Sequence, residues 1–193
     1  MLLKPALFLD RDGVIIEEVD YLSHPSQVVL IPGAAQAIAR ANQSAIPVVV
    51  ATNQAGVARG YFPEANVTLV HKHLDILLAT HGAHIDRYYY CPHHPTEGIA
   101  SYACTCACRK PQPGMLLLAA SQLGLDLRRS YLVGDKVSDL QAGMAVGCRT
   151  ILVQTGYGSA HSLFLQEHGL TATQLARDLG HAVELCLPNL VAS

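Results

Sequence analysis

The chain has 193 residues, of which 50% are hydrophobic and 15% are charged. This composition can bury a sizeable core and excludes an intrinsically disordered chain. Its 13 basic and 15 acidic side chains give a net charge of −2 without long runs of one sign. This balance argues against a nucleic-acid backbone or an anionic membrane surface as a partner. We expect one domain over residues 1–193, working as a monomer.

The N-terminal segment does not have the pattern of a signal peptide, because its apolar run is short and no small-residue cleavage site follows it. No stretch approaches the roughly 20 apolar residues that a membrane-spanning helix needs. The sequence therefore predicts a cytoplasmic protein. Two of its six cysteines, Cys148 and Cys186, lie in apolar contexts and are expected in the core.

Short apolar runs of strand length alternate with longer segments of helical periodicity, which is typical of an α/β fold with a parallel sheet. The predicted strands are 7–10, 47–52, 85–91, 131–134 and 150–153. The predicted helices are 33–45, 63–82, 113–123, 139–146 and 171–187, the last within a C-terminal helical tail of residues 160–193. Residues 157–160 are interpreted as a short flexible join before that tail.

Polar residues follow three of the predicted strands, at positions 10–13, 52–54 and 134–139. Ligands of an open parallel sheet bind beyond the carboxyl ends of its strands. Alternate side chains point the same way, so Asp10 and Asp12 can face one site, where two close carboxylates favour a cation. With Asp135 from another strand, oxygen ligands suited to Mg²⁺ come together. The alternative is that Asp10 and Asp12 only open a turn before Gly13.

The polar motifs resemble, in their order, those of the haloacid dehalogenase (HAD) superfamily of phosphotransferases. The motifs are Phe8–Gly13, Ala51–Gln54, Lys110 and Val133–Asp139, and the match runs from about residue 7 to residue 157. The resemblance implies that Asp10 attacks phosphorus to form an aspartyl-phosphate. It implies that Asp12 protonates the leaving oxygen and later activates water, which suits a phosphatase.

The same resemblance implies the remaining parts of the site and the fold. Mg²⁺ would be held by Asp10, by the main-chain carbonyl of Asp12 and by Asp135, with Asp139 nearby. Thr52 and Lys110 would hold the phosphate. The implied fold is a three-layer, Rossmann-like parallel sheet with helices on both faces and no separate cap domain.

A cysteine cluster in residues 91–108 points to a metal, because disulfides are rare in a reducing compartment. A Cys₃His set is a common closed, tetrahedral zinc site, and the candidate ligands are Cys91, His93, Cys106 and Cys108. Spacing alone leaves Cys104 as an alternative to Cys108, and His94 as an alternative to His93. Four protein ligands leave no coordination position for water, so zinc would hold the loop together and perform no chemistry. The remaining alternative is a set of unligated thiols.

Arg109 and Lys110 follow this cluster directly, and residues 106–115 together with 91–95 closely resemble the zinc-containing bacterial heptose bisphosphate phosphatases. The resemblance selects Cys106 and Cys108 over Cys104, and His93 over His94. It implies removal of the C7 phosphate from D-glycero-D-manno-heptose 1,7-bisphosphate, a step toward nucleotide-activated heptose for surface polysaccharide. The implied phosphate and substrate contacts are Glu18, Val19, Asp20, Tyr21, Thr52, Asn53, Gln54, Arg109, Lys110 and Lys136.

Three other functions are weighed against this one. Histidinol-phosphate phosphatases share the Asp motifs and a zinc loop, but their loop is typically shorter. A DNA 3′-phosphatase has a similar first motif but needs a basic surface. A zinc-stabilised binding module without catalysis is disfavoured because the set of catalytic motifs is complete. The histidines of the long helix, His71 among them, are expected to be solvated or partly packed and receive no catalytic role.

Overall fold

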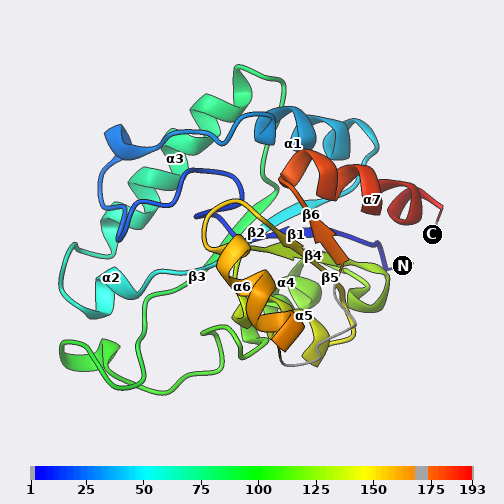
Figure 1. The fold of residues 1–193 in the computed structure, drawn as a ribbon. Coiled ribbons are helices and arrows are strands. Elements are labelled where there is room, and N and C mark those ends of the chain that lie inside the picture. Colours follow the sequence, from blue (N-terminus) through cyan, green and yellow to red (C-terminus); the bar gives the residue numbers. More distant parts are fainter. Residues whose placement is uncertain (1–2, 168–173, 193) are drawn as a thin grey trace.

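The computed structural model describes residues 3–167 and 174–192. Its centre is a six-stranded parallel sheet in the order β3-β2-β1-β4-β5-β6 (Figure 1). The strands are β1 (Leu7–Leu9), β2 (Val48–Asn53), β3 (Arg87–Cys91), β4 (Tyr131–Gly134), β5 (Arg149–Val153) and β6 (Gln174–Ala176). The helices are α1 (Ala34–Gln43), α2 (Ala55–Ala58), α3 (Ala65–Ala79), α4 (Gly114–Leu123), α5 (Val137–Ala145), α6 (Gly158–Glu167) and α7 (Leu179–Val191). Short 3-10 turns lie at Pro25–Gln27, Ala100–Tyr102 and Leu127–Arg129.

Helices cover both faces of the sheet. As a result, all side chains of the central strands β1 and β4 are buried, whichever face they point to. Figure 1 shows α1, α3 and α7 on one face of the sheet and α4 and α5 on the other. In β1, Leu7 and Leu9 belong to the core with α1, α3 and α7, whereas Phe8 belongs to the core with α4 and α5. The near-continuous apolar runs of the central strands follow from this double coverage. The expected three-layer α/β fold is confirmed.

The order in which the chain adds strands to the sheet reverses between β1 and β4. The chain moves outward from β1 through β2 to β3 on one side, then returns to β4 beside β1 and moves outward to β6 on the other. A crevice forms beyond the carboxyl ends of strands at such a point, and it is the usual ligand site of these sheets. The polar motifs after β1 and β4 are therefore neighbours in space.

The first five strands and the first four long helices match the sequence prediction to within a few residues, but the C-terminal part was predicted wrongly. Residues 157–160 do not form a flexible join, because α6 begins at Gly158. The tail is not wholly helical, because β6 pairs with β5; Leu175 lies in that strand and is 42% exposed. The start of the predicted final helix, residues 171–173, lies outside the described residues.

The final helix does pack onto the core as expected, although it begins later in the chain. Its buried residues include Leu179, Ala182, Val183 and Cys186. Cys148 is also buried, so both isolated cysteines lie in the core. Among the described residues, no helix has the length and apolar character required to span a bilayer.

Candidate active site

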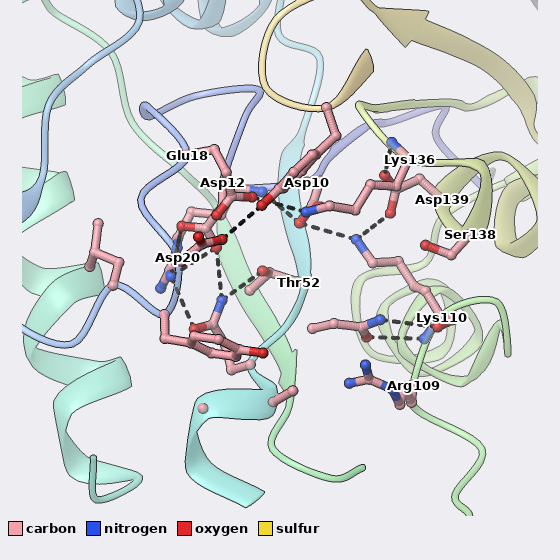
Figure 2. Close-up of a pocket in the computed structure, with 18 of the residues that line it drawn as sticks. Asp10, Asp12, Glu18, Asp20, Thr52, Arg109, Lys110, Lys136, Ser138 and Asp139 are labelled. Atoms are coloured by element: carbon pink, nitrogen blue, oxygen red, sulfur yellow. Dashed lines mark hydrogen bonds and ion pairs between the residues drawn. The ribbon is translucent and has the colours of Figure 1, made fainter. Parts of the chain in front are cut away.

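A buried lysine lies between two buried carboxylates at the end of β1. Lys110 Nζ is 3.1 Å from Asp10 Oδ1 and 2.7 Å from Asp139 Oδ1 (Figure 2). The same ammonium donates to the carbonyl of Ala51 at 2.6 Å. Burial alone would raise the pKa of Asp10, but the charges of Lys110 and Lys136 outweigh it and hold the pKa below its ordinary value. Asp10 is therefore ionised, as a carboxylate nucleophile must be.

Three carboxylates converge on a place suited to a hard cation. One oxygen from each of Asp10, Asp135 and Asp139 lies within 4.8 Å of the others. Asp135 Oδ2 accepts from the main-chain N–H of Tyr157 at 2.9 Å, whereas the buried Oδ1 has no hydrogen-bond donor among the described residues. Burial, together with the charge of Asp10, raises the pKa of Asp135 to about 7. Lys136 Nζ is 3.7 Å from this Oδ1, which is too far for a hydrogen bond. A buried carboxylate oxygen without a hydrogen-bond donor, close to two further carboxylates, fits Mg²⁺.

Position 13 must be glycine because the carboxylate of Asp135 lies against it. Gly13 has φ of 78°, in the left-handed region, and a Cβ there would overlap the carboxylate of Asp135. The turn after β1 can therefore lie against the end of β4 only without a side chain. The turn at Gly13 and the approach of Asp10 to Asp135 are thus both present in one structure.

The second aspartate of the first motif has different neighbours from the first. Asp12 is only partly buried, and its carboxylate accepts from the side chains of Arg11 and Gln54. Arg11 is 1% exposed and also contacts His71. His71 is buried, whereas it was expected to be solvated or partly packed. Sequence reasoning missed Arg11 and His71. A charged residue flanked by two candidate catalytic carboxylates was the available signal for Arg11.

The residues at the end of β2 contribute an amide and hydroxyl network. Thr52 Oγ1 accepts from Gln54 Nε2 at 2.9 Å, which links the second motif to Asp12. Asn53 binds the main chain of Lys110 with both atoms of its amide, at 3.0 Å each. The three residues line one cavity of about 510 Å³ together with Asp10 and the other polar residues of the strand ends.

The segment after β1 closes one side of this cavity through two polar contacts. Lys136 Nζ is 3.0 Å from Glu18 Oε2, and the Tyr157 hydroxyl donates to Asp20 Oδ1 at 2.7 Å. Tyr21 also lines the cavity and is 41% exposed. Val19 is not among the lining residues and packs against the main core.

Three thiols and one imidazole form a compact cluster beside the cavity. The candidate ligand atoms are Cys91 Sγ, His93 Nδ1, Cys106 Sγ and Cys108 Sγ, which lie within 4.8 Å of one another. Their neighbouring separations run from 2.9 to 3.6 Å. A tetrahedral zinc with bonds of about 2.3 Å places sulfur atoms about 3.8 Å apart, so a small outward shift accommodates the ion.

The two alternative ligands of this cluster lie elsewhere. His94 Nδ1 accepts from the main-chain N–H of Glu97, and Cys104 is not part of the cluster. The cluster also connects to the cavity, because Arg109 Nη1 donates to the carbonyl of His93 at 3.0 Å. Arg109 lines the cavity beside Lys110.

The proteins to which this chain is similar are hydrolases of one kind. Residues 107–182 match the model of the HAD-hydrolase-like family. The chain is 42% identical over 185 residues to a D-glycero-D-manno-heptose-1,7-bisphosphate 7-phosphatase of Thermosynechococcus vestitus, covering 94% of each chain. It is 42% identical over 153 residues to the D-glycero-beta-D-manno-heptose-1,7-bisphosphate 7-phosphatase of Escherichia coli K12, covering 79% of this chain and 80% of that one.

A solved structure agrees with these relatives. The D,D-heptose 1,7-bisphosphate phosphatase from B. bronchiseptica, in complex with magnesium and phosphate, superposes with a TM-score of 0.84 at 39% identity. The superposition covers 95% of this chain and 98% of that one.

Proposed function

The chain belongs to the HAD-like hydrolases, in the family of the heptose-1,7-bisphosphate 7-phosphatases, and from that premise we propose that it removes the C7 phosphate of D-glycero-D-manno-heptose 1,7-bisphosphate. It is a phosphatase, and the product of the proposed reaction is heptose 1-phosphate. The observation that carries the proposal is the pairing of buried Lys110 with Asp10 and Asp139 in a polar cavity, beside an Asp135 oxygen that accepts no hydrogen bond from the described residues.

In the first half of the reaction, a carboxylate oxygen of Asp10 forms a bond to phosphorus while the bond from phosphorus to the C7 oxygen breaks. Asp12 donates its proton to that departing oxygen, so the product leaves as an alcohol. Lys110 and Thr52 hold the phosphoryl oxygens, and Lys110 compensates the negative charge that gathers there.

In the second half, Asp12 accepts a proton from water, and the water oxygen forms a bond to phosphorus. The bond between phosphorus and Asp10 then breaks, which releases inorganic phosphate and restores the Asp10 carboxylate. Lys110 keeps its contacts through both steps, because its ammonium is fixed by Asp139 and by the carbonyl of Ala51.

Two metal ions belong to the proposal. Mg²⁺ would be held by Asp10, Asp135 and the main-chain carbonyl of Asp12, with Asp139 nearby, and when bound it neutralises charge on the transferring phosphoryl group. Zn²⁺ would be held by Cys91, His93, Cys106 and Cys108, where it fixes the loop that carries Arg109 and Lys110.

Substrate contacts are assigned to the rest of the cavity lining. The residues are Glu18, Asp20, Tyr21, Asn53, Gln54, Arg109 and Lys136. Arg109 and Lys136 supply cations for a second phosphate or for sugar hydroxyls. The chain would act on this small substrate as a cytoplasmic monomer, without a membrane or nucleic-acid partner.

The test is phosphate release by the purified protein with Mg²⁺ on both anomers of heptose 1,7-bisphosphate and on histidinol phosphate, at equal concentration. We expect a large preference in kcat/KM for one heptose anomer. A preference for histidinol phosphate would keep the mechanism and overturn the substrate. A protein that holds zinc but releases phosphate from none of the three would support a binding module.

A further inference from the structure

The largest fully buried side chain of the described residues is a charged one. Arg11 is 1% exposed, and it lies between Asp10 and Asp12 in the sequence. A buried guanidinium is costly unless its N–H groups are bonded. An apolar residue would fill the same space without that cost, so the partners of Arg11 indicate what it does.

The principal partner is the carboxylate of Asp12. Arg11 Nη2 lies 3.0 Å from Asp12 Oδ1 and 2.9 Å from Oδ2, and Arg11 Nε lies 3.2 Å from Oδ1. Gln54 Nε2 donates to Oδ2 at 3.0 Å, and Gln54 Oε1 accepts from Arg11 Nη2 at 3.0 Å. Among the described residues, no other group donates to this carboxylate, so its orientation is set by Arg11 and Gln54.

Arg11 is itself fixed from the side away from the cavity. Its Nη1 lies 3.3 Å from His71 Nε2 on α3. A guanidinium can only donate, so Nε2 is the acceptor and the imidazole carries its proton on Nδ1. Burial and the charge of Arg11 lower the pKa of His71 to about 3, which keeps the ring neutral. The ring of Tyr88 on β3 stacks on this imidazole at 4.3 Å, with 15° between the planes.

We propose that Arg11 is a positioning residue for the phosphatase reaction, and that its guanidinium, held by His71 and Gln54, orients the Asp12 carboxylate for proton transfer. The inference rests on the proposed function, in which Asp12 is the acid and then the base. Arg11 does not touch the reacting atoms in this account. Its effect is therefore confined to the steps that need Asp12.

Two substrates with different leaving groups distinguish the step in which Asp12 acts as an acid from the step in which it acts as a base. A sugar alkoxide needs a proton to depart, whereas p-nitrophenolate departs without one. Hydrolysis of the aspartyl-phosphate needs the base whichever substrate formed it. In Arg11→Met, kcat for heptose 1,7-bisphosphate should fall by about 100-fold, in line with the usual worth of general acid–base catalysis. With p-nitrophenyl phosphate, the variant should release about one nitrophenolate per site in a fast burst and then turn over slowly.

A conservative variant and a remote one complete the experiment. Arg11→Lys keeps the charge but cannot bind Asp12 through a planar fork, so it should show the same burst with a smaller loss of kcat. It also serves if Arg11→Met does not fold. Arg40→Met on α1, where the half-exposed Arg40 pairs with Glu184, should leave the kinetics on both substrates unchanged. Zinc content and Tm are measured for every variant.

Equal losses on both substrates without a burst, in a folded Arg11 variant, would overturn the inference and leave the proposed function standing. Kinetics like those of the wild type would do the same. A wild-type protein inactive on both substrates would overturn the proposed function, and the inference with it.

Discussion

The side-chain amide of Asn53 holds the main chain of Lys110 on both sides. Asn53 Nδ2 donates to the Lys110 carbonyl, and Asn53 Oδ1 accepts from the Lys110 N–H, each at 3.0 Å. The loop that follows the cysteine cluster is thereby fixed to the end of β2. This reciprocal pair places the Lys110 ammonium between Asp10 and Asp139, so Asn53 acts on the site through Lys110 as well as through the cavity wall it forms.

Asn53→Ala should therefore lower kcat more than it raises KM. Both hydrogen bonds are lost, which costs about 1–3 kcal/mol of stability, and a displaced Lys110 should lower kcat by about tenfold or more. Asn42→Ala is the matched control, because Asn42 Oδ1 accepts from the His84 N–H away from the cavity. Its kcat should stay within twofold of the wild type. An Asn53→Ala enzyme with unchanged kcat and a lower Tm would reduce Asn53 to a stabilising role.

Asp10→Asn should abolish phosphate release while leaving zinc content unchanged. An amide cannot attack phosphorus, so kcat should fall by at least about a thousandfold. Asp10 is not among the candidate zinc ligands, so we expect the variant to keep the zinc content of the wild type. Asp178→Asn at the start of α7 is the matched control, since the Asp178 side chain caps that helix by accepting from the His181 N–H. Turnover near the wild-type rate in Asp10→Asn would remove Asp10 as nucleophile.

The sheet was predictable because buried strands appear in the sequence as short apolar runs, and the ligand-binding edge appears as polar residues directly after them. The strands from β1 to β5 are short and mostly apolar, and the polar residues that follow three of them fall at one edge of the sheet by geometry alone. Asp10, Asp135 and Asp139 meet for that reason. The strand β6 has three residues and an exposed Leu175, so its sequence lacks a buried apolar run and predicts a helix instead.

The contacts within the site were less predictable, because they join residues far apart in the sequence. Arg11 and His71 are 60 positions apart, and Asn53 and Lys110 are 57 positions apart. Residue type and spacing placed Asn53 at the cavity but not against the Lys110 main chain. Charge alone predicts an exposed Arg11, and its burial follows only from the partners that the fold assembles around it.

The magnesium-free protein should lose stability as pH rises toward neutrality. Burial and the charge of Asp10 raise the pKa of Asp135 from 3.8 to about 7 in the folded state. Between these two values, the folded state binds a proton that the unfolded state has released, so the free energy of unfolding falls with pH by at most about 1.4 kcal/mol per unit. Tm measured without Mg²⁺ should thus be lower at pH 7.5 than at pH 5.5.

Adding Mg²⁺ should reverse this trend, because the cation binds the ionised carboxylates. The increase in Tm on adding Mg²⁺ should be larger at pH 7.5 than at pH 5.5. Asp135→Asn removes the titrating group and should flatten both dependences. If Asp135→Asn retains the wild-type pH dependence of Tm, another group causes it.

Removing the metal from the cysteine cluster should disable the site as well as loosen the loop. Arg109 and Lys110 follow Cys108 directly, and Arg109 is also bonded to the His93 carbonyl, so both cations lose their support when the ligands separate. Cys106→Ser should bind less than one zinc per chain, melt several degrees lower and lose most of its kcat. Cys104→Ser changes the same atom two positions away, outside the cluster, and should keep zinc, Tm and kcat. Zinc loss in Cys104→Ser together with retention in Cys106→Ser would instead make Cys104 the ligand, and full activity without zinc would separate the cluster from the reaction.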